Sequence, residues 1–149
     1  MNKKNNIDEK VVHDFGKEWQ AFNHHDLDNE SLQSAFDSYF NFFPFSDLKD
    51  AEGFDMGCGS GRWAQFVSSK VGFLNCIDPS KTALDQAKLN MADMANCSLE
   101  CAGVDNNSLK DGSQDFGYSL GVLHHIPDTA LALQSCSKKL KSGAPFLLY

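Results

Sequence analysis

Hydrophobic residues recur at helical spacing in the first part of the chain. One stripe begins at Val11 and continues at intervals of four, four and three residues to Phe22, which predicts an amphipathic helix. A second stripe follows Asp28, a residue type that caps helices, and ends before Pro44. Two amphipathic helices that cover one side of the remaining chain are therefore predicted. The stripes consist of Val11, Phe15, Trp19 and Phe22, and of Leu32, Phe36, Tyr39, Phe40 and Phe43.

From residue 53 onwards, short apolar runs alternate with segments of helical periodicity. Five runs have the length and composition of strands, namely 53–57, 73–77, 98–102, 116–120 and 145–149. Among the helices between them, one is expected to bury Leu84, Ala87, Met91 and Met94, and another starts at Pro127-Asp128-Thr129 and is expected to bury Leu133, Cys136 and Leu140 before it ends near Gly143.

Repeated strand–helix units of this length predict an α/β fold, with a parallel sheet of about five strands flanked by helices on both faces. Ligands of such sheets bind at the carboxyl ends of the strands. The 149 residues fit a single domain. We therefore predict an N-terminal helical cap in residues 1–50 and an open-sheet core in residues 51–149.

Composition and charge narrow the expected location and partners. Hydrophobic residues make up 42% and charged residues 22% of the chain, as in soluble globular proteins. No apolar run reaches the ~20 residues that span a bilayer, and the polar start lacks the core of a signal peptide. The net charge of -7 repels phosphate backbones. We expect a cytoplasmic protein without a membrane span or a nucleic-acid partner.

The five cysteines are odd in number and include no CxxC pair. Most lie in apolar stretches, where cysteine acts as a small buried hydrophobe, so reduced thiols are expected. Cys97, Cys101 and Cys136 can be combined with His124 and His125 into a zinc site, but their spacing matches no common ligand pattern. We therefore predict no metal site.

The segment from Asp55 to Gly61 carries the most chemical information. An acidic residue on a predicted strand precedes the alternating glycines Gly57, Gly59 and Gly61, and glycine leaves space where a ligand approaches the backbone. The same pattern also occurs in a plain strand-to-helix connection. Asp78 ends the next predicted strand, where a carboxylate can accept hydrogen bonds from both hydroxyls of a ribose. Together these features predict a cofactor that contains adenosine.

The glycine spacing separates two kinds of adenosine cofactor. A dinucleotide-binding turn of the GxGxxG type needs glycine at position 62, which here is Arg62. The GxGxG pattern instead resembles motif I of the class I S-adenosylmethionine-dependent methyltransferases. The similarity continues through 76–80, 102–106, 115–128 and 140–149. Across about two-thirds of the chain, the series resembles the methyltransferase type 11 family, whose members act mostly on small molecules. An NAD-type oxidoreductase domain is the less favoured alternative.

The resemblance implies a Rossmann-like fold and a set of residues that bind S-adenosyl-L-methionine, with S-adenosyl-L-homocysteine as the product. The three glycines would pass against the methionine part, Asp55 would lie near its amino group and Asp78 would hold the ribose. Asp105 and Asn106 would contact the adenine, although Asp105 also fits a simple turn. The implied cofactor-binding residues are Asp55, Gly57, Cys58, Gly59, Gly61, Asp78, Pro79, Asp105, Asn106, Leu120 and Leu123.

His124 and His125 have two interpretations. Histidine can act as a general base near neutral pH, and it is also a routine packing residue at strand ends. Methyl transfer depends mainly on in-line positioning of the acceptor, so the two histidines are only weak candidates for catalysis.

The acceptor class is narrowed by a missing motif. Related enzymes that methylate amino groups of nucleic-acid bases carry an Asn/Asp/Ser-Pro-Pro-aromatic motif after the fourth strand, where this chain reads Gly121-Val122-Leu123-His124. With the acidic net charge, this favours a small-molecule acceptor that enters beneath the N-terminal helices.

The resemblance also implies a sheet of seven strands, of which this sequence supplies five, so the last two strands of the family sheet would be missing. Two alternatives follow: a small-molecule methyltransferase, or a non-catalytic fragment that binds S-adenosylmethionine or S-adenosylhomocysteine. The exposed edge of the last predicted strand would be covered by a second copy of the chain in a homodimer or by the N-terminal helices.

Overall fold

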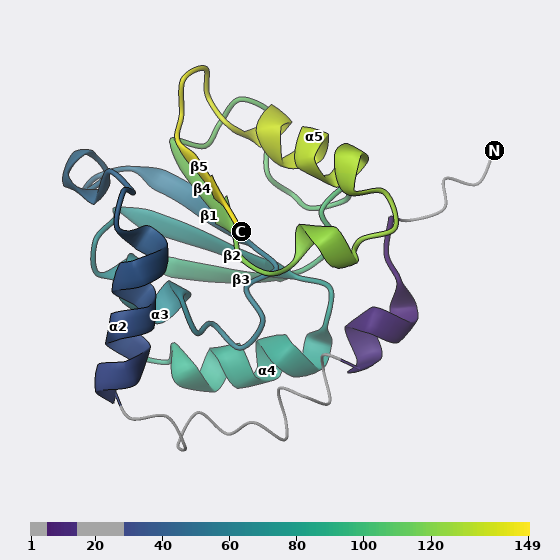
Figure 1. Cartoon of the computed structure of the whole chain (residues 1–149), viewed down its shortest axis with the longest axis horizontal. Helices are drawn as coiled ribbons and strands as arrows, with labels where there is room; N and C mark the ends of the chain where they lie inside the picture. Colours follow the sequence, from purple (N-terminus) through teal and green to yellow (C-terminus); the bar gives the residue numbers. More distant parts are fainter. Residues whose placement is uncertain (1–5, 15–28) are drawn as a thin grey trace.

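The computed structural model describes residues 6–14 and 29–149, and within them five strands form one fully parallel sheet with the order β3-β2-β1-β4-β5 (Figure 1). This confirms the predicted Rossmann-like α/β fold. Each strand lies within one or two residues of its predicted position. The strands are β1 Glu52–Met56, β2 Phe73–Asp78, β3 Cys97–Cys101, β4 Phe116–Ser119 and β5 Phe146–Leu148.

Two of the helices begin at polar residues whose side chains accept a hydrogen bond from an amide of the first turn. The Ser80 hydroxyl accepts a hydrogen bond from the Ala83 amide, and the Asp128 carboxylate accepts one from the Leu131 amide at 2.9 Å. Residues 9–14 are also helical. The longer helices are α2 Asn29–Phe40, α3 Ala64–Ser68, α4 Lys81–Asn90 and α5 Thr129–Lys139, and the short 3-10 helices are η2 Phe45–Asp47 and η3 Leu123–His125.

Of the two predicted N-terminal helices, the second is confirmed as α2. Val11 of the first stripe lies in the helical residues 9–14, whereas Phe15, Trp19 and Phe22 fall outside the described residues. In the described part of the chain, no helix combines the length and apolar character needed to cross a bilayer.

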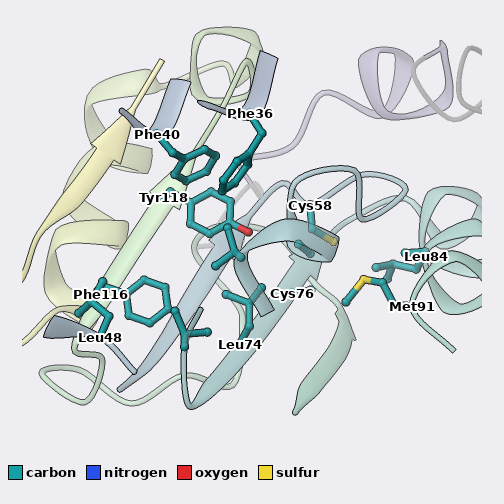
Figure 2. Close-up of a cluster of buried hydrophobic side chains, with 14 residues drawn as sticks. Phe36, Phe40, Leu48, Cys58, Leu74, Cys76, Leu84, Met91, Phe116 and Tyr118 are labelled. Carbon is teal, nitrogen blue, oxygen red and sulfur yellow. The ribbon is translucent and has the colours of Figure 1, made fainter. Parts of the chain in front are cut away.

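Two hydrophobic clusters cover the two faces of the sheet. The α2-side cluster joins α2, α3 and α4 to side chains of β2 and β4, and Figure 2 shows Phe36 and Phe40 against Tyr118. The rings of Phe36 and Phe40 stack with centroids 4.5 Å apart, and Phe40 meets Tyr118 edge-on at 5.3 Å. The α5-side cluster joins α5 to Phe54 and Met56 of β1. Phe54 and Met56 therefore face the α5-side cluster, and Asp55 between them faces the α2-side cluster.

The predicted inner face of α5 needs a correction. Leu133 was expected to be buried, but it is 40% exposed, and the buried positions are Ala132 and Cys136. The helix reads Ala-Leu-Ala-Leu near its start, so apolar residues occupy more than one face and periodicity does not select between them. The small Ala132 side chain lets the helix lie close to the sheet.

Candidate functional site

The chain leaves β1 through a turn that depends on glycine. Gly57, Gly59 and Gly61 have φ angles of +83°, +55° and +79°, a left-handed conformation that side chains disfavour. A Cβ atom at Gly57 would lie 2.5 Å from the Val122 side chain, and one at Gly61 would lie 2.5 Å from the sulfur of Met91. The glycine pattern therefore has a structural cause in addition to any ligand.

The end of β2 holds this turn in place. The amides of Gly57 and Cys58 both donate to the carbonyl oxygen of Ile77, at 2.7 and 3.1 Å. The Gly59 amide donates to Oδ2 of Asp78 at 2.9 Å, and the Ser80 amide donates to Oδ1 of the same carboxylate at 2.8 Å. Asp78 thus joins the glycine turn to the start of α4.

Asp78 is buried at the edge of a cavity. Burial raises the pKa of its carboxyl group, and the hydrogen bonds from the Ser80 and Gly59 amides oppose that rise. Each carboxylate oxygen has accepted one backbone hydrogen bond, and a carboxylate offers about four acceptor positions in all. Asp78 therefore retains acceptor capacity toward a ligand.

The cavity has a volume of about 320 Å³ and lies at the carboxyl ends of the strands, where open α/β sheets bind ligands. This size is typical of the lower range of small-molecule sites. Six of the predicted cofactor residues line it: Gly57, Cys58, Gly59, Asp78, Pro79 and Leu120.

The other five predicted cofactor residues do not line the cavity. Leu123 is buried in the α5-side cluster, and Gly61 packs against Met91. Asp105 is exposed and accepts a hydrogen bond from the Asn6 amide at 3.4 Å, while Oδ1 of Asn106 accepts the Gly103 amide at 2.6 Å. Their roles, and that of Asp55, stay predictions.

Asp55 lies in the α2-side core rather than at the cavity surface. It is 3% exposed and sits opposite Tyr118 in the register of β1 and β4. Burial raises the pKa of Asp55 to about 8, and the Tyr118 hydroxyl partly opposes the shift. Figure 2 shows the Tyr118 hydroxyl directed toward the part of the cluster that holds Cys58 and Cys76.

The predictions missed an aromatic and cationic wall of the cavity, made by Tyr39, Arg62, Trp63 and Tyr149. Tyr39 meets Trp63 edge-on at 5.4 Å and Tyr149 at 4.8 Å, and the Arg62 guanidinium lies 5.7 Å from the Trp63 ring centre. Burial lowers the pKa of Arg62, and the nearby Tyr39 opposes this. Arg62 and Trp63 follow the glycine motif in the chain and could have indicated this wall, whereas the helical stripe assigned Tyr39 to the core.

The two histidines differ in their relation to the cavity. Both lie in η3 with their ring centres 3.9 Å apart, but only His125 is among the residues that line the cavity. Partial burial, and then the neighbouring His124, lower the pKa of His125. This shift favours the neutral form of His125, which is the form that accepts a proton.

The described residues contain no disulfide bond and no close group of potential metal ligands. All five cysteines are free thiols. In the segments 6–14 and 29–149, no three His, Cys, Asp or Glu side chains are grouped closely enough to hold a metal ion.

Residues 54–148 match the family model of the methyltransferase domain. The chain belongs to this methyltransferase family. The match confirms the resemblance that the glycine turn and the later motifs indicated.

Curated relatives of this methyltransferase domain are longer proteins. This chain is 30% identical over 95 residues to the ubiquinone biosynthesis O-methyltransferase of Nitrosomonas europaea, and the match covers 60% of this chain and 39% of that protein. It is 29% identical over 125 residues to the tRNA U34 carboxymethyltransferase of Aliarcobacter butzleri, covering 83% and 41%. The chain thus spans about two-fifths of the length of these relatives.

Solved structures confirm the fold of the domain. An S-adenosylmethionine-dependent methyltransferase of Mesorhizobium loti superposes with a TM-score of 0.68 at 23% identity, over 78% of this chain and 53% of that one. Phosphoethanolamine N-methyltransferase 1 of Haemonchus contortus, solved with phosphoethanolamine and S-adenosylhomocysteine, gives 0.69 at 16% identity, over 95% and 32%.

Proposed function

We propose that this methyltransferase domain binds S-adenosylmethionine in the cavity at the carboxyl ends of β1 and β2 and directs its methyl group to a small-molecule acceptor. The observation that carries the proposal is the glycine turn held over Asp78 at the cavity wall. When bound, S-adenosylmethionine supplies a sulfonium-activated methyl group. The residues of the chain supply binding, orientation and exclusion of water.

The cofactor end of the proposed site fits its chemistry. Gly57 and Gly59 line the cavity and have no side chains, so the methionine part of the cofactor can approach their backbone. The remaining acceptor positions of Asp78 match the two hydroxyls of a ribose. The resemblance implies further contacts, from Asp55 to the amino group and from Asp105 and Asn106 to the adenine. These three residues do not line the cavity, so their contacts stay predictions.

The acceptor end lies along Tyr39, Arg62, Trp63 and His125. Aromatic faces bind flat organic molecules through large contact areas, and a neutral His125 can accept a proton from an acceptor hydroxyl. The enclosed volume of about 320 Å³ suits a small molecule. Only one of the two relatives described above has a name that refers to tRNA, and the net charge of -7 disfavours a nucleic-acid acceptor here.

Binding without turnover is the second candidate function. It is supported by the share of the relatives that the chain spans, 39% and 41% of their lengths. A methyl-transfer assay over a panel of small metabolites separates the two functions, because only the first predicts methylated product.

The division of the chain at residue 50 and a homodimer through the outer edge of β5 stay predictions.

Calorimetry with S-adenosylmethionine, S-adenosylhomocysteine and NAD in parallel tests the cofactor assignment. We expect saturable heats with the first two and none with NAD. Binding of NAD alone would overturn the proposal in favour of a dinucleotide site. Absence of binding to all three would overturn it as well.

A further inference from the structure

The side chain of Asn6 forms a two-way hydrogen bond with a distant backbone segment. Its Nδ2 donates to the carbonyl oxygen of Asp128 at 2.9 Å, and its Oδ1 accepts the amide of Asp128 at 2.9 Å. The two residues are 122 positions apart in the sequence, and Asn6 is only 7% exposed. Because an amide side chain offers one donor group and one acceptor, it can bond the C=O and the N–H of the same residue at once.

Asn6 also reaches a second loop. Its backbone amide donates to Oδ2 of Asp105 at 3.4 Å. Asp105 follows β3, whereas Asp128 precedes α5 and caps it. Asn6 therefore connects the loop after β3 with the loop after η3, both at the carboxyl edge of the sheet.

The segment that Asn6 fixes forms one wall of the cavity. Ile7, Val11 and Val12 are half-buried and line the cavity together with Asn6. Oδ1 of Asp8 accepts the amides of Lys10 and Val11, at 3.0 and 3.2 Å, and so starts the helical turn. Figure 1 shows this purple segment beside the carboxyl ends of the strands.

At Gly103, the N-terminal wall lies very close to the loop after β3. A Cβ atom added to Gly103 would lie 2.9 Å from Cδ1 of Ile7. The loop after β3 and the N-terminal segment are thus in direct contact, and this contact lies next to the hydrogen bonds of Asn6. This N-terminal wall and the glycine turn both line the cavity, so a molecule bound there would contact both.

We propose that Asn6 is a positioning residue for the cofactor, which holds residues 6–14 as a wall of the cavity through its paired hydrogen bonds to Asp128. The inference rests on the proposed function, because it assigns the enclosed ligand as S-adenosylmethionine or its product. Asn6 acts through the segment that it holds. Its removal should therefore release a bound ligand faster, with a smaller effect on association.

The variants are Asn6→Ala, which removes the side-chain hydrogen bonds, and Asn6→Asp, which keeps the acceptor but loses the donor. If circular dichroism shows that either variant is unfolded, Asn6→Gln, with its longer side chain, provides a third variant. His13→Ala is the matched control, because His13 lies in the same segment, is exposed and is absent from the cavity lining.

Two measurements decide the question in the full chain. Hydrogen exchange without ligand should show the Asp128 amide exchanging faster in Asn6→Ala than in the wild type, because its acceptor, Oδ1 of Asn6, is removed. The change should be smaller in Asn6→Asp, which keeps an acceptor at this position. The dissociation constant for S-adenosylhomocysteine should rise about tenfold, mainly through a faster off-rate. His13→Ala should match the wild type in both measurements.

The outcomes separate this proposal from the proposed function. Unchanged exchange at Asp128 would overturn the role of Asn6 whatever the ligand data show. Faster exchange with an unchanged dissociation constant would overturn the cofactor role of the wall. If the wild type binds no S-adenosylhomocysteine, the proposed function fails together with the cofactor role, while the exchange result still reports whether Asn6 holds the segment.

Discussion

Asp55 and Tyr118 face each other across β1 and β4, and Oδ2 of Asp55 and the Tyr118 hydroxyl are both buried without a well-formed hydrogen bond. The hydroxyl is still close enough to Asp55 to lower the pKa of that carboxyl group, although burial outweighs this effect. A buried carboxyl group that lacks sufficient hydrogen bonds prefers its protonated form, since the charged form is poorly solvated. The pKa of Asp55, raised to about 8, expresses that preference.

The raised pKa of Asp55 predicts that stability falls as the pH rises. Between its ordinary pKa of 3.8 and about 8, the folded chain binds more protons at this site than the unfolded chain. The free energy of unfolding should therefore decrease from about pH 5 to pH 8. Urea unfolding of the wild type and Asp55→Asn at both pH values measures the effect, and the decrease should be smaller in the variant.

Burial also raises the pKa of Asp78 and contributes in the same direction. The comparison with Asp55→Asn separates the two groups, because Asp78 is present in both proteins. An equally steep decrease in the variant would show that Asp55 is not the group responsible.

Removal of the Asp78 carboxylate should weaken both the site and the fold around it. Asp78→Ala loses the acceptors of the Gly59 and Ser80 amides as well as the proposed ribose contact. Hydrogen bonds to charged groups contribute about 1.5 to 3 kcal/mol each, so the dissociation constant for S-adenosylhomocysteine should rise roughly ten- to hundredfold. Calorimetry measures the change.

Asp85→Ala is the control for Asp78→Ala, because Asp85 is exposed on α4 and pairs only with Lys81 among the contacts described for it. Its dissociation constant should equal that of the wild type. An unchanged constant in Asp78→Ala would remove the ribose assignment.

A branched side chain in the glycine turn should abolish cofactor binding. Gly59 has a φ of +55° and lines the cavity, so Gly59→Val introduces both backbone strain and bulk where the ligand is proposed to lie. Gly112→Val carries comparable strain at a φ of +66°, with no atom within 4 Å of the added Cβ. Binding and circular dichroism are measured for both.

Loss of S-adenosylhomocysteine binding in Gly59→Val with a retained spectrum, together with normal binding in Gly112→Val, is the expected pattern. Full affinity in Gly59→Val would contradict a close approach of ligand to backbone. Loss of the spectrum would identify Gly59 as a structural residue.

The two histidines should differ in methyl transfer. His125 lines the cavity and His124 does not. His125→Asn should therefore slow turnover, by up to the factor of about 100 to 10,000 that a general base contributes. His124→Asn should have the wild-type rate. Both variants should bind S-adenosylhomocysteine normally, and equal rates for the two would exclude His125 as a base.

The sequence predicted the fold well because its strongest signals are local. Strand lengths, the glycine spacing and the capping residue Asp128 depend on neighbours in the chain. The inner face of α5 was wrong at Leu133, since leucines and alanines alternate there and small residues can mark the side of closest approach. Helical periodicity does not resolve such a segment.

The site was harder to predict, because its walls come from distant segments. Gly57, Gly59 and Asp78 were expected at the cavity and line it. The alternation of β1 has two possible assignments when both faces of a parallel sheet are covered, so the sequence does not show that Asp55 enters the α2-side core. Asn6 and Asp128 are 122 residues apart in the sequence, and no local sequence pattern predicts their contact.

The glycine turn has one more consequence, which concerns conformational entropy. Two of its amides donate to the Ile77 carbonyl and a third to Asp78 in the protein alone, so the turn loses its freedom when the chain folds. Ordering a residue costs about 1 to 2 kcal/mol, and a ligand that meets an ordered turn avoids that cost. Two of the three bonds end on the backbone oxygen of Ile77, so these two contacts do not use a side chain as acceptor.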